Sequence, residues 1–99
     1  MPVAFDEVIE KITSAARQVG VDEGSSPVLV AVVEEFRRKL SKAEQHATDG
    51  VPDHDSVVEL EQAGDSAKAA AEADAGLSSQ AREAVLAAHL AICKLKAGA

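Results

Sequence analysis

The chain has 99 residues, a formal net charge of −7, 46% hydrophobic residues and a single cysteine. This length suits one domain over residues 1–99, and one cysteine excludes an internal disulfide framework. The lack of a leader-like or membrane-spanning apolar run favours a cytoplasmic protein, or one exported by a route without a cleaved signal. The negative charge argues against a nucleic-acid or anionic-membrane binder, because both surfaces select for Lys and Arg, so we expect a neutral or basic protein partner, no nucleic acid and no membrane.

Residues 5–19 carry the first helical pattern. Their apolar side chains recur every three or four residues, which places them on one side of a helix, and the charged side chains fall on the other side. Gly20 follows the last of them and predicts the end of this helix, with residues 21–24 as a connector. The apolar arc consists of Phe5, Val8, Ile9, Ile12, Ala15, Ala16 and Val19.

A second helix is predicted over residues 27–47. Ser26 supplies an N-cap hydroxyl, and Pro27 suits the first helical position. The first turns are apolar on every side, so we expect other helices or a partner to wrap them, with Val28 and Val30 as candidate partner contacts. Residues 28–33 alone also fit a buried strand, but no second strand candidate exists to pair with them. Farther along, the apolar residues narrow to a seam of the kind that packs against another helix: Leu29, Val33, Phe36, Leu40, Ala43 and Ala47.

The second half of this helix contains the one local basic cluster: Arg37, Arg38, Lys39 and Lys42. Cations near the end of a helix complement its dipole. Glu34 and Glu35 precede Arg38 and Lys39 by four residues, which is an ion-pair spacing. We therefore expect a solvated, self-neutralised face rather than a phosphate-binding patch.

A third helix is predicted over residues 56–75. The preceding residues 48–55 break the helical pattern with an Asp-Gly pair, a proline and further acids. Ser56 and Glu59 then predict a capping box. The apolar side of this helix consists mainly of small residues, which implies a close approach to a neighbouring helix: Val57, Leu60, Ala63, Gly64, Ala67, Ala70 and Ala71.

A fourth helix is predicted over residues 80–97, capped by Ser78 or Ser79 after Gly76 has ended the third. So short a connection predicts a tight αα-hairpin of helices three and four. One apolar stripe suits the core: Ala81, Val85, Ala88, Ile92 and Leu95. A second stripe lies on a different side: Leu86, Leu90, Cys93 and Ala97. Either this helix is central in the bundle, or its second stripe faces another subunit or a partner.

Two polar groups of the fourth helix could take part in chemistry. His89 and Cys93 stand one helical turn apart, so both could reach one metal ion, but two ligands do not make a site. Cys93 also lies late in its helix, where the dipole does not favour a thiolate. We expect no metal, no cofactor and no catalytic residue.

A second functional hypothesis comes from the segment Asp55-Ser56-Val57-Val58-Glu59-Leu60. It resembles the Asp-Ser-Leu start of the second helix in acyl carrier proteins, which are small, acidic and four-helical. The resemblance implies phosphopantetheine attached to Ser56. The chain departs from that family by Val57 in place of the leucine and by a full extra helix before the serine, and an N-cap role also explains Ser56.

Together these patterns predict an all-α antiparallel bundle of about four helices. Its second stripe on helix four exceeds what a monomeric four-helix bundle needs, so we expect a homodimer or a hetero-oligomer. The leading functional hypothesis is a small acidic, non-enzymatic interaction module, such as an adaptor, small chaperone, inhibitor or immunity-type protein. Its expected partner interface consists of Leu86, Leu90, Cys93, Val28 and Val30, and the alternative is an acyl-carrier-like protein modified on Ser56.

Overall fold

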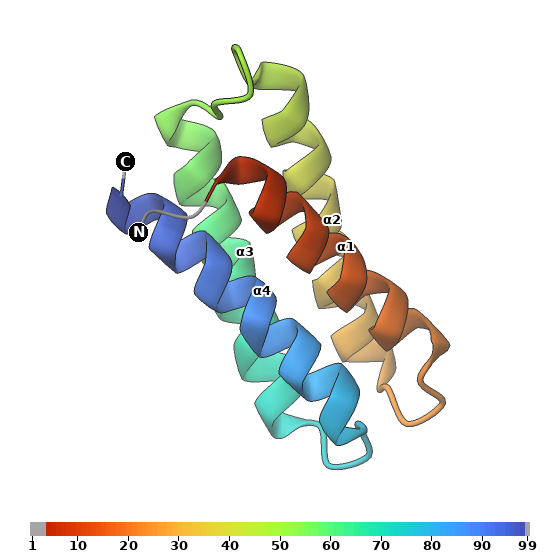
Figure 1. The fold of residues 1–99 in the computed structure, drawn as a ribbon. Helices are drawn as coiled ribbons and strands as arrows, with labels where there is room; N and C mark the ends of the chain where they lie inside the picture. The colour runs from red at the N-terminus through yellow and green to blue at the C-terminus, as the bar shows by residue number, and fades with distance from the viewer. Residues whose placement is uncertain (1–3, 99) are drawn as a thin grey trace.

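The computed structural model describes residues 4–98, which form four α-helices, so the all-α class is confirmed. The helices α1 (Phe5–Val21), α2 (Pro27–His46), α3 (His54–Ala73) and α4 (Ser79–Gly98) run up and down in antiparallel order (Figure 1). The α1–α2 and α3–α4 connections lie at one end of the bundle, and the α2–α3 loop lies at the other. Within residues 4–98, each helix packs against two neighbours and none has the length and apolarity of a membrane span.

The core follows the predicted stripes. Every residue of the α2 seam is buried except Ala47, which is half-buried, and the α4 core stripe is buried except for the half-buried Leu95. Helices α3 and α4 pack side by side as the predicted hairpin. The largest fully buried side chains are Phe36, Ile12, Leu29, Leu60 and Ile92.

Two serines cap the helices that follow the short connections. The Ser26 hydroxyl accepts a hydrogen bond from the backbone N–H of Leu29 at 3.1 Å, as predicted. At α4 the cap is Ser78, whose hydroxyl accepts a hydrogen bond from the N–H of Ala81 at 3.1 Å. Each hydroxyl satisfies a donor that the first turn of a helix leaves without an intrahelical partner.

The start of α3 differs from the prediction. The helix begins at His54 with Asp53 at the N-cap, so Ser56 lies inside the first turn and is only 5% exposed. The predicted capping box of Ser56 with Glu59 is therefore wrong. The Glu59 carboxylate instead accepts a hydrogen bond from the Lys39 ammonium at 2.9 Å, which ties α3 to α2 rather than to its own N-terminus.

The ends of α1 and α3 also differ from the prediction. Helix α1 continues through Gly20 to Val21, and the Ser25 hydroxyl donates to the carbonyl of Val19 at 2.9 Å. Helix α3 stops at Ala73, two residues before the predicted end, where the Arg82 guanidinium donates to carbonyls of the final turn and the connection. Side chains from outside each helix thus satisfy carbonyls at its end, and neither helix ends at the residue that the glycine signals predicted.

The α1–α2 and α3–α4 connections share the sequence Asp-x-Gly-x-Ser, at residues 22–26 and 74–78. The Asp22 carboxylate accepts one hydrogen bond from the N–H of Gly24 at 2.8 Å within its own connection. Its second oxygen accepts another from the N–H of Ser78 at 3.1 Å, across the end of the bundle. One carboxylate therefore fixes its own turn and holds the other connection.

The Asp74 carboxylate does the same in the opposite direction. It accepts a hydrogen bond from the N–H of Gly76 at 3.1 Å and another from the N–H of Ser26 at 2.8 Å. Gly24 and Gly76 meet between the two carboxylates, so close that a Cβ atom added to Gly24 would overlap the carbonyl oxygen of Gly76. We call this arrangement the loop clasp, comprising residues 22–26 and 74–78.

The two hairpins place their buried residues at equivalent positions. Aligning the two connections matches the five buried residues of α1 with five buried residues of α3. It also matches large side chains of the first hairpin with small ones of the second, as in Ile12 with Gly64 and Phe36 with Ala88. The first hairpin supplies most of the bulk of the core, and the second supplies the small residues that let the helices approach.

Stability is expected to fall as the pH is lowered below about 5. The Ser78 side chain and the N–H of Gly24 lower the pKa of Asp22, and the N–H groups of Ser26 and Gly76 lower the pKa of Asp74, both from an ordinary 3.8. The unfolded chain then binds protons that the folded chain does not, so this stabilisation is complete above the ordinary pKa and is lost as the pH falls through the folded values. Urea unfolding followed by far-UV circular dichroism between pH 7 and pH 3 measures it.

The variant Asp22→Asn/Asp74→Asn identifies the groups responsible. Each amide keeps one acceptor oxygen and turns the other into a donor that faces a backbone N–H, so the variant is less stable at pH 7. Its stability should also change less between pH 5 and pH 3. Glu23→Gln, in the same connection, should keep the full pH dependence, and an unchanged slope in the double variant would assign the effect elsewhere.

Candidate functional site

The outward side of α4 carries the largest apolar side chain that the helices leave on the surface. Leu90 is 53% exposed, and Leu86 and Cys93 beside it are half-buried. Within residues 4–98, α4 packs against α1 and α3 but not against α2, so it is not central in the bundle. Of the two positions that the sequence left open for α4, the structure has the one that leaves the second stripe on the surface.

The start of α2 is not wrapped by the other helices. Val28 is 68% exposed and Val30 is 39% exposed, while Leu29 between them is fully buried. Val28 lines a shallow groove with Ala70 and Ala73 of α3. Of the two ways in which this turn was expected to be covered, by other helices or by a partner, the helices packed against α2, which are α1 and α3, leave Val28 and Val30 exposed. The place of these two residues in a partner interface stays a prediction.

The basic cluster of α2 is neutralised by carboxylates. Arg37 pairs with Glu34 and Arg38 with Glu35, each at 3.2 Å, so the predicted pairing of Glu34 with Arg38 is wrong by one residue. Ammonium groups of the same cluster converge on Glu59 of α3, those of Lys39 at 2.9 Å and Lys42 at 3.3 Å. Every cation of the cluster thus faces a carboxylate, as expected of a self-neutralised face.

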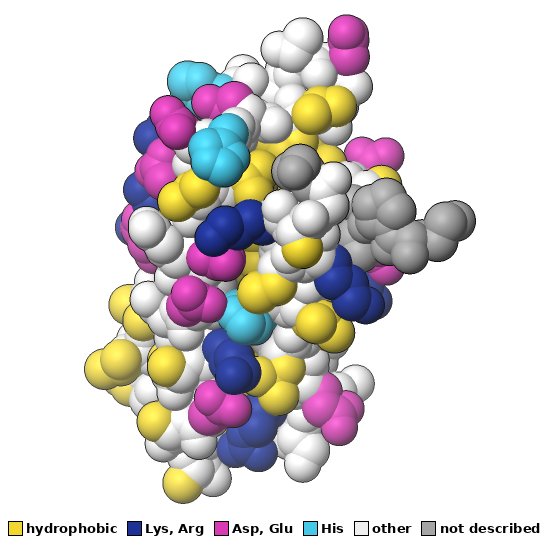
Figure 2. All heavy atoms as spheres, turned by 90° about the vertical axis from the view of Figure 1, so that its left-hand side faces the viewer, with side chains coloured by type: hydrophobic (Ala, Val, Ile, Leu, Met, Phe, Trp, Pro, Cys, Tyr) yellow, Lys and Arg dark blue, Asp and Glu magenta, His cyan; other side chains and the backbone are white. Residues whose placement is uncertain are grey.

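A band of charged side chains, which includes imidazole, runs down the face formed by α3 and α4, with hydrophobic atoms on both sides (Figure 2). Its ion pairs join the two helices, as between Lys96 and Glu61 at 3.1 Å. Such exposed pairs stabilise a fold by well under about 1 kcal/mol each. The band therefore defines the polarity of this face more than it stabilises the bundle.

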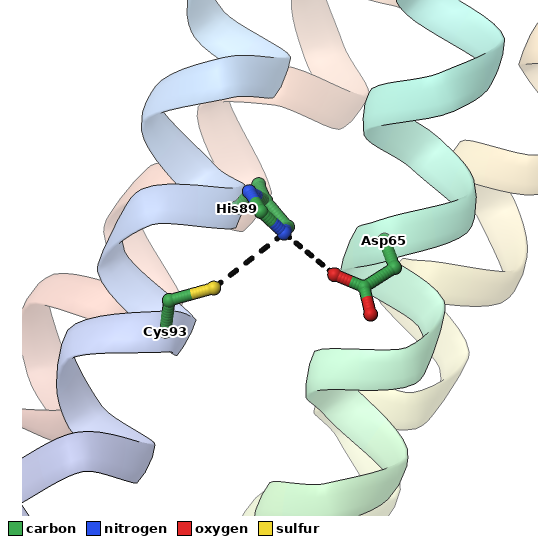
Figure 3. Close-up of side chains that lie close together, drawn as sticks. All are labelled: Asp65, His89 and Cys93. Atoms are coloured by element: carbon green, nitrogen blue, oxygen red, sulfur yellow. Dashed lines mark hydrogen bonds and ion pairs between the residues drawn. The ribbon is translucent and has the colours of Figure 1, made fainter.

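Near the middle of this face, Asp65 of α3 meets His89 and Cys93 of α4 (Figure 3). His89 Nε2 lies 2.7 Å from Asp65 Oδ1 and 3.5 Å from Cys93 Sγ. One oxygen, one nitrogen and one sulfur atom thus lie within 4.8 Å of one another. The side chain of His89 is 18% exposed and that of Asp65 is 60% exposed, so the cluster lies at the edge of the helix interface and is open to solvent.

Gly64 explains why the imidazole can lie against α3. A Cβ atom at this position would be 3.3 Å from Phe36 Cζ, 3.3 Å from Ile92 Cγ2 and 3.4 Å from His89 Cδ2. A glycine inside a helix costs about 1 kcal/mol relative to alanine. Here it provides the close approach that the small residues of α3 predicted, and it seats the ring of His89 between Asp65 and the core.

This geometry differs from that of a Cys-His-Asp catalytic site. In such a site the thiol and the carboxylate engage opposite nitrogens of the imidazole, so that one nitrogen takes the proton of the thiol while the carboxylate orients the ring and stabilises its charge through the other. Here Asp65 and Cys93 both approach Nε2. Burial and the charges of Glu61 and Asp65 also raise the pKa of Cys93, which favours the less reactive thiol.

Ser56, the residue of the carrier hypothesis, lies within the first turn of α3 and is buried. A serine that carries a prosthetic group must present its hydroxyl to a modifying enzyme. In the described structure the Ser56 side chain contributes to the environment of Asp53, whose pKa it lowers. The geometry therefore gives no support to modification at this position.

Sequence spacing paired His89 with Cys93 but did not find Asp65. The missing signal is the register of the hairpin: Asp65 and His89 lie equally far along the chain from Leu77 in the connection. In an antiparallel hairpin such residues face each other, so the short connection was enough to place Asp65 beside His89.

Comparison with known proteins adds no assignment, because no family model, curated protein or solved structure matches this chain.

Proposed function

We propose that the chain is a non-enzymatic interaction module that binds another protein through the outward side of α4. The observation that carries the proposal is the exposure of Leu90 on a helix that is already packed on its other sides. Leu86, Cys93 and Ala97 extend the surface along the same stripe, at a spacing that suits the apolar face of a partner helix. We call these four residues the α4 stripe.

The charge of the chain favours a basic partner over a second copy. With a net charge of −7, two copies would bring like charges together across a two-fold interface. A neutral or basic protein would instead be attracted by the acidic surface, and its encounter would slow as added salt screens the charges. The expected occupant of the α4 stripe is therefore an amphipathic helix with basic residues beside its apolar face.

Leu90→Asp is expected to weaken this association by about 2 kcal/mol or more, which is ~30-fold, because a carboxylate would be buried in an apolar contact. The fold should persist, since Leu90 is half exposed in the free chain. Native mass spectrometry of the full chain isolated from its host detects the complex, and titration of the identified partner measures the affinity. Val51→Asp is the matched control, because Val51 is 65% exposed in the α2–α3 loop, away from the stripe.

The controls separate the possible outcomes. Circular dichroism should show equal helicity in both variants, and Val51→Asp should bind as the parent chain does. A folded Leu90→Asp variant that keeps the complex unchanged would contradict the proposal. If the parent chain is a homodimer and Leu90→Asp abolishes that dimer, the α4 stripe is an interface, but its partner is a second copy of the chain and not a basic protein.

A further inference from the structure

We propose that Asp65, His89 and Cys93 form a binding site for Zn²⁺. The three side chains supply one carboxylate oxygen, one imidazole nitrogen and one sulfur, and these atoms lie within 4.8 Å of one another (Figure 3). Zinc in proteins is held by these three ligand types, and three protein ligands leave a fourth position for water. Of its three residues, only Cys93 also belongs to the α4 stripe. The zinc site can therefore be tested on the chain alone, without a protein partner.

The distances suit a tetrahedral ion after one small adjustment. With zinc–nitrogen and zinc–oxygen bonds of about 2.0 Å and a zinc–sulfur bond of about 2.3 Å, the sulfur and nitrogen of a tetrahedron are ~3.5 Å apart and the nitrogen and oxygen ~3.3 Å apart. Cys93 Sγ and His89 Nε2 already lie 3.5 Å apart. Asp65 Oδ1, at 2.7 Å from Nε2, must move outward, which its 60% exposed side chain has room to do.

Without a metal, one imidazole nitrogen serves two neighbours at once. A single nitrogen, His89 Nε2, faces both the carboxylate and the thiol. If it carries a proton, it donates to Asp65 and cannot accept from Cys93, and if it carries a lone pair, it cannot donate to Asp65. A cation at the point where the three atoms converge accepts a lone pair from each of them.

Coordination has a simple proton balance. The thiol of Cys93 becomes a thiolate, its electron pair forms the bond to zinc, and its proton passes to solvent. The imidazole binds through the lone pair of Nε2, so its ring proton resides on Nδ1. The carboxylate of Asp65 binds without losing a proton, and no electron transfer is involved.

The ligands come from rigid elements. His89 and Cys93 are one turn apart on α4, and Asp65 lies on the neighbouring helix of the same hairpin. Ile92, fully buried between the two α4 ligands, anchors that turn of the helix in the core, and Gly64 seats the imidazole. Sites on packed helices hold their ligands with less freedom than sites on loops.

The donor set selects zinc over the hard divalent cations. Calcium and magnesium prefer all-oxygen sites of six or more ligands, whereas thiolate and imidazole suit zinc. The acidic loop around Asp49 and Asp53, with His46 and His54 nearby, is the competing location for an added cation. It lacks a sulfur ligand, and a test of the proposal must separate the two locations.

The test uses the tag-free full chain, Zn²⁺ as the probe and the only thiol of the sequence as the reporter. Saturating Zn²⁺ is expected to slow alkylation of Cys93 by iodoacetamide at least tenfold, and Co²⁺ in its place should give a thiolate-to-cobalt absorption band at one equivalent. His89→Gln and Asp65→Asn leave the thiol intact but should weaken Zn²⁺ binding by at least the ~10–100-fold that loss of an outer-shell partner costs. Asp65→Asn, at an exposed position, keeps the test decisive should His89→Gln disturb the fold.

The control variant His46→Gln/His54→Gln removes both histidines of the acidic loop. It should keep the protection of Cys93 and the one-equivalent cobalt band. The Zn²⁺ concentration that gives half-maximal protection of Cys93 compares the affinities of the variants. No protection in the parent chain, an unchanged half-maximal concentration in Asp65→Asn and His89→Gln, or loss of protection in the loop variant would each overturn the proposal.

Discussion

Gly24→Ala is expected to lower the free energy of unfolding by about 3 kcal/mol, at the upper end of the usual cost of overpacking. The added Cβ atom would overlap the carbonyl oxygen of Gly76 and lie 2.8 Å from its carbonyl carbon. Both obstacles are backbone atoms, which cannot turn aside as the end of a flexible side chain can. Relief would require the two connections to separate, which breaks the cross-bonds from Ser26 and Ser78 in the loop clasp.

Gly20→Ala is the matched control for this variant. It makes the same chemical change four residues earlier, inside α1, where nothing lies within 4 Å of the added Cβ atom. Alanine should therefore stabilise the chain by up to about 1 kcal/mol through helix propensity. Urea unfolding followed by circular dichroism measures both variants, which suits a chain without Trp or Tyr. Equal and small effects of the two variants would show that the connections are not held close together.

Phe36→Ala is expected to cost about 3–5 kcal/mol, the usual range for removal of a fully buried aromatic side chain. Phe36 is fully buried, and its ring reaches from α2 to within van der Waals contact of the Gly64 position on α3. Small domains are typically stable by about 5–15 kcal/mol, so this one change removes a large share of the total. It also removes the surface that supports α3 beneath the imidazole of His89.

Leu90→Ala provides the comparison for the aromatic change. It also shortens a large apolar residue to alanine, but at a half-exposed position, and should alter the free energy of unfolding by only about 0.5 kcal/mol. The same urea experiment checks both. A loss below about 1 kcal/mol for Phe36→Ala would mean that the core rearranges around the gap and that Phe36 is not its centre.

The helices and the core were predictable because both depend on periodic burial. In α2, the four–three spacing from Leu29 to Ala43 identified every residue that the structure buries in that helix. The small residues of α3 likewise predicted a close approach, which Gly64 provides. The spacing of apolar residues shows which side of a helix avoids water, and that side is the one that is buried in the structure.

Helix ends were less predictable, since contacts from distant residues decide them. Ser56 and Glu59 have the local spacing of a capping box, yet Glu59 binds the ammonium groups of α2 and the helix begins earlier, at His54. Similarly, Arg82 from α4 satisfies carbonyls where α3 ends. A local motif competes with tertiary partners that only the folded chain brings near.

In the candidate zinc site, too, one part could be predicted from the sequence and another part depends on the folded structure. The spacing of His89 and Cys93 was visible in the sequence, while Asp65 depends on how α3 and α4 are set against each other. That setting follows from the length of the connection, so the third ligand required reasoning about the hairpin rather than about one helix. The exposure of Leu90 depended on one further fact, the position of α4 at the edge of the bundle.

The unequal division of bulk between the two hairpins also determines which pairings the chain can make. Two copies of the first hairpin would set large residues such as Ile12 and Phe36 against one another, and two copies of the second would leave gaps around Gly64 and Ala88. Each hairpin therefore packs better against the other hairpin than against a copy of itself. In a crowded solution of newly made chains, this asymmetry disfavours like-with-like association and directs each first half to a second half.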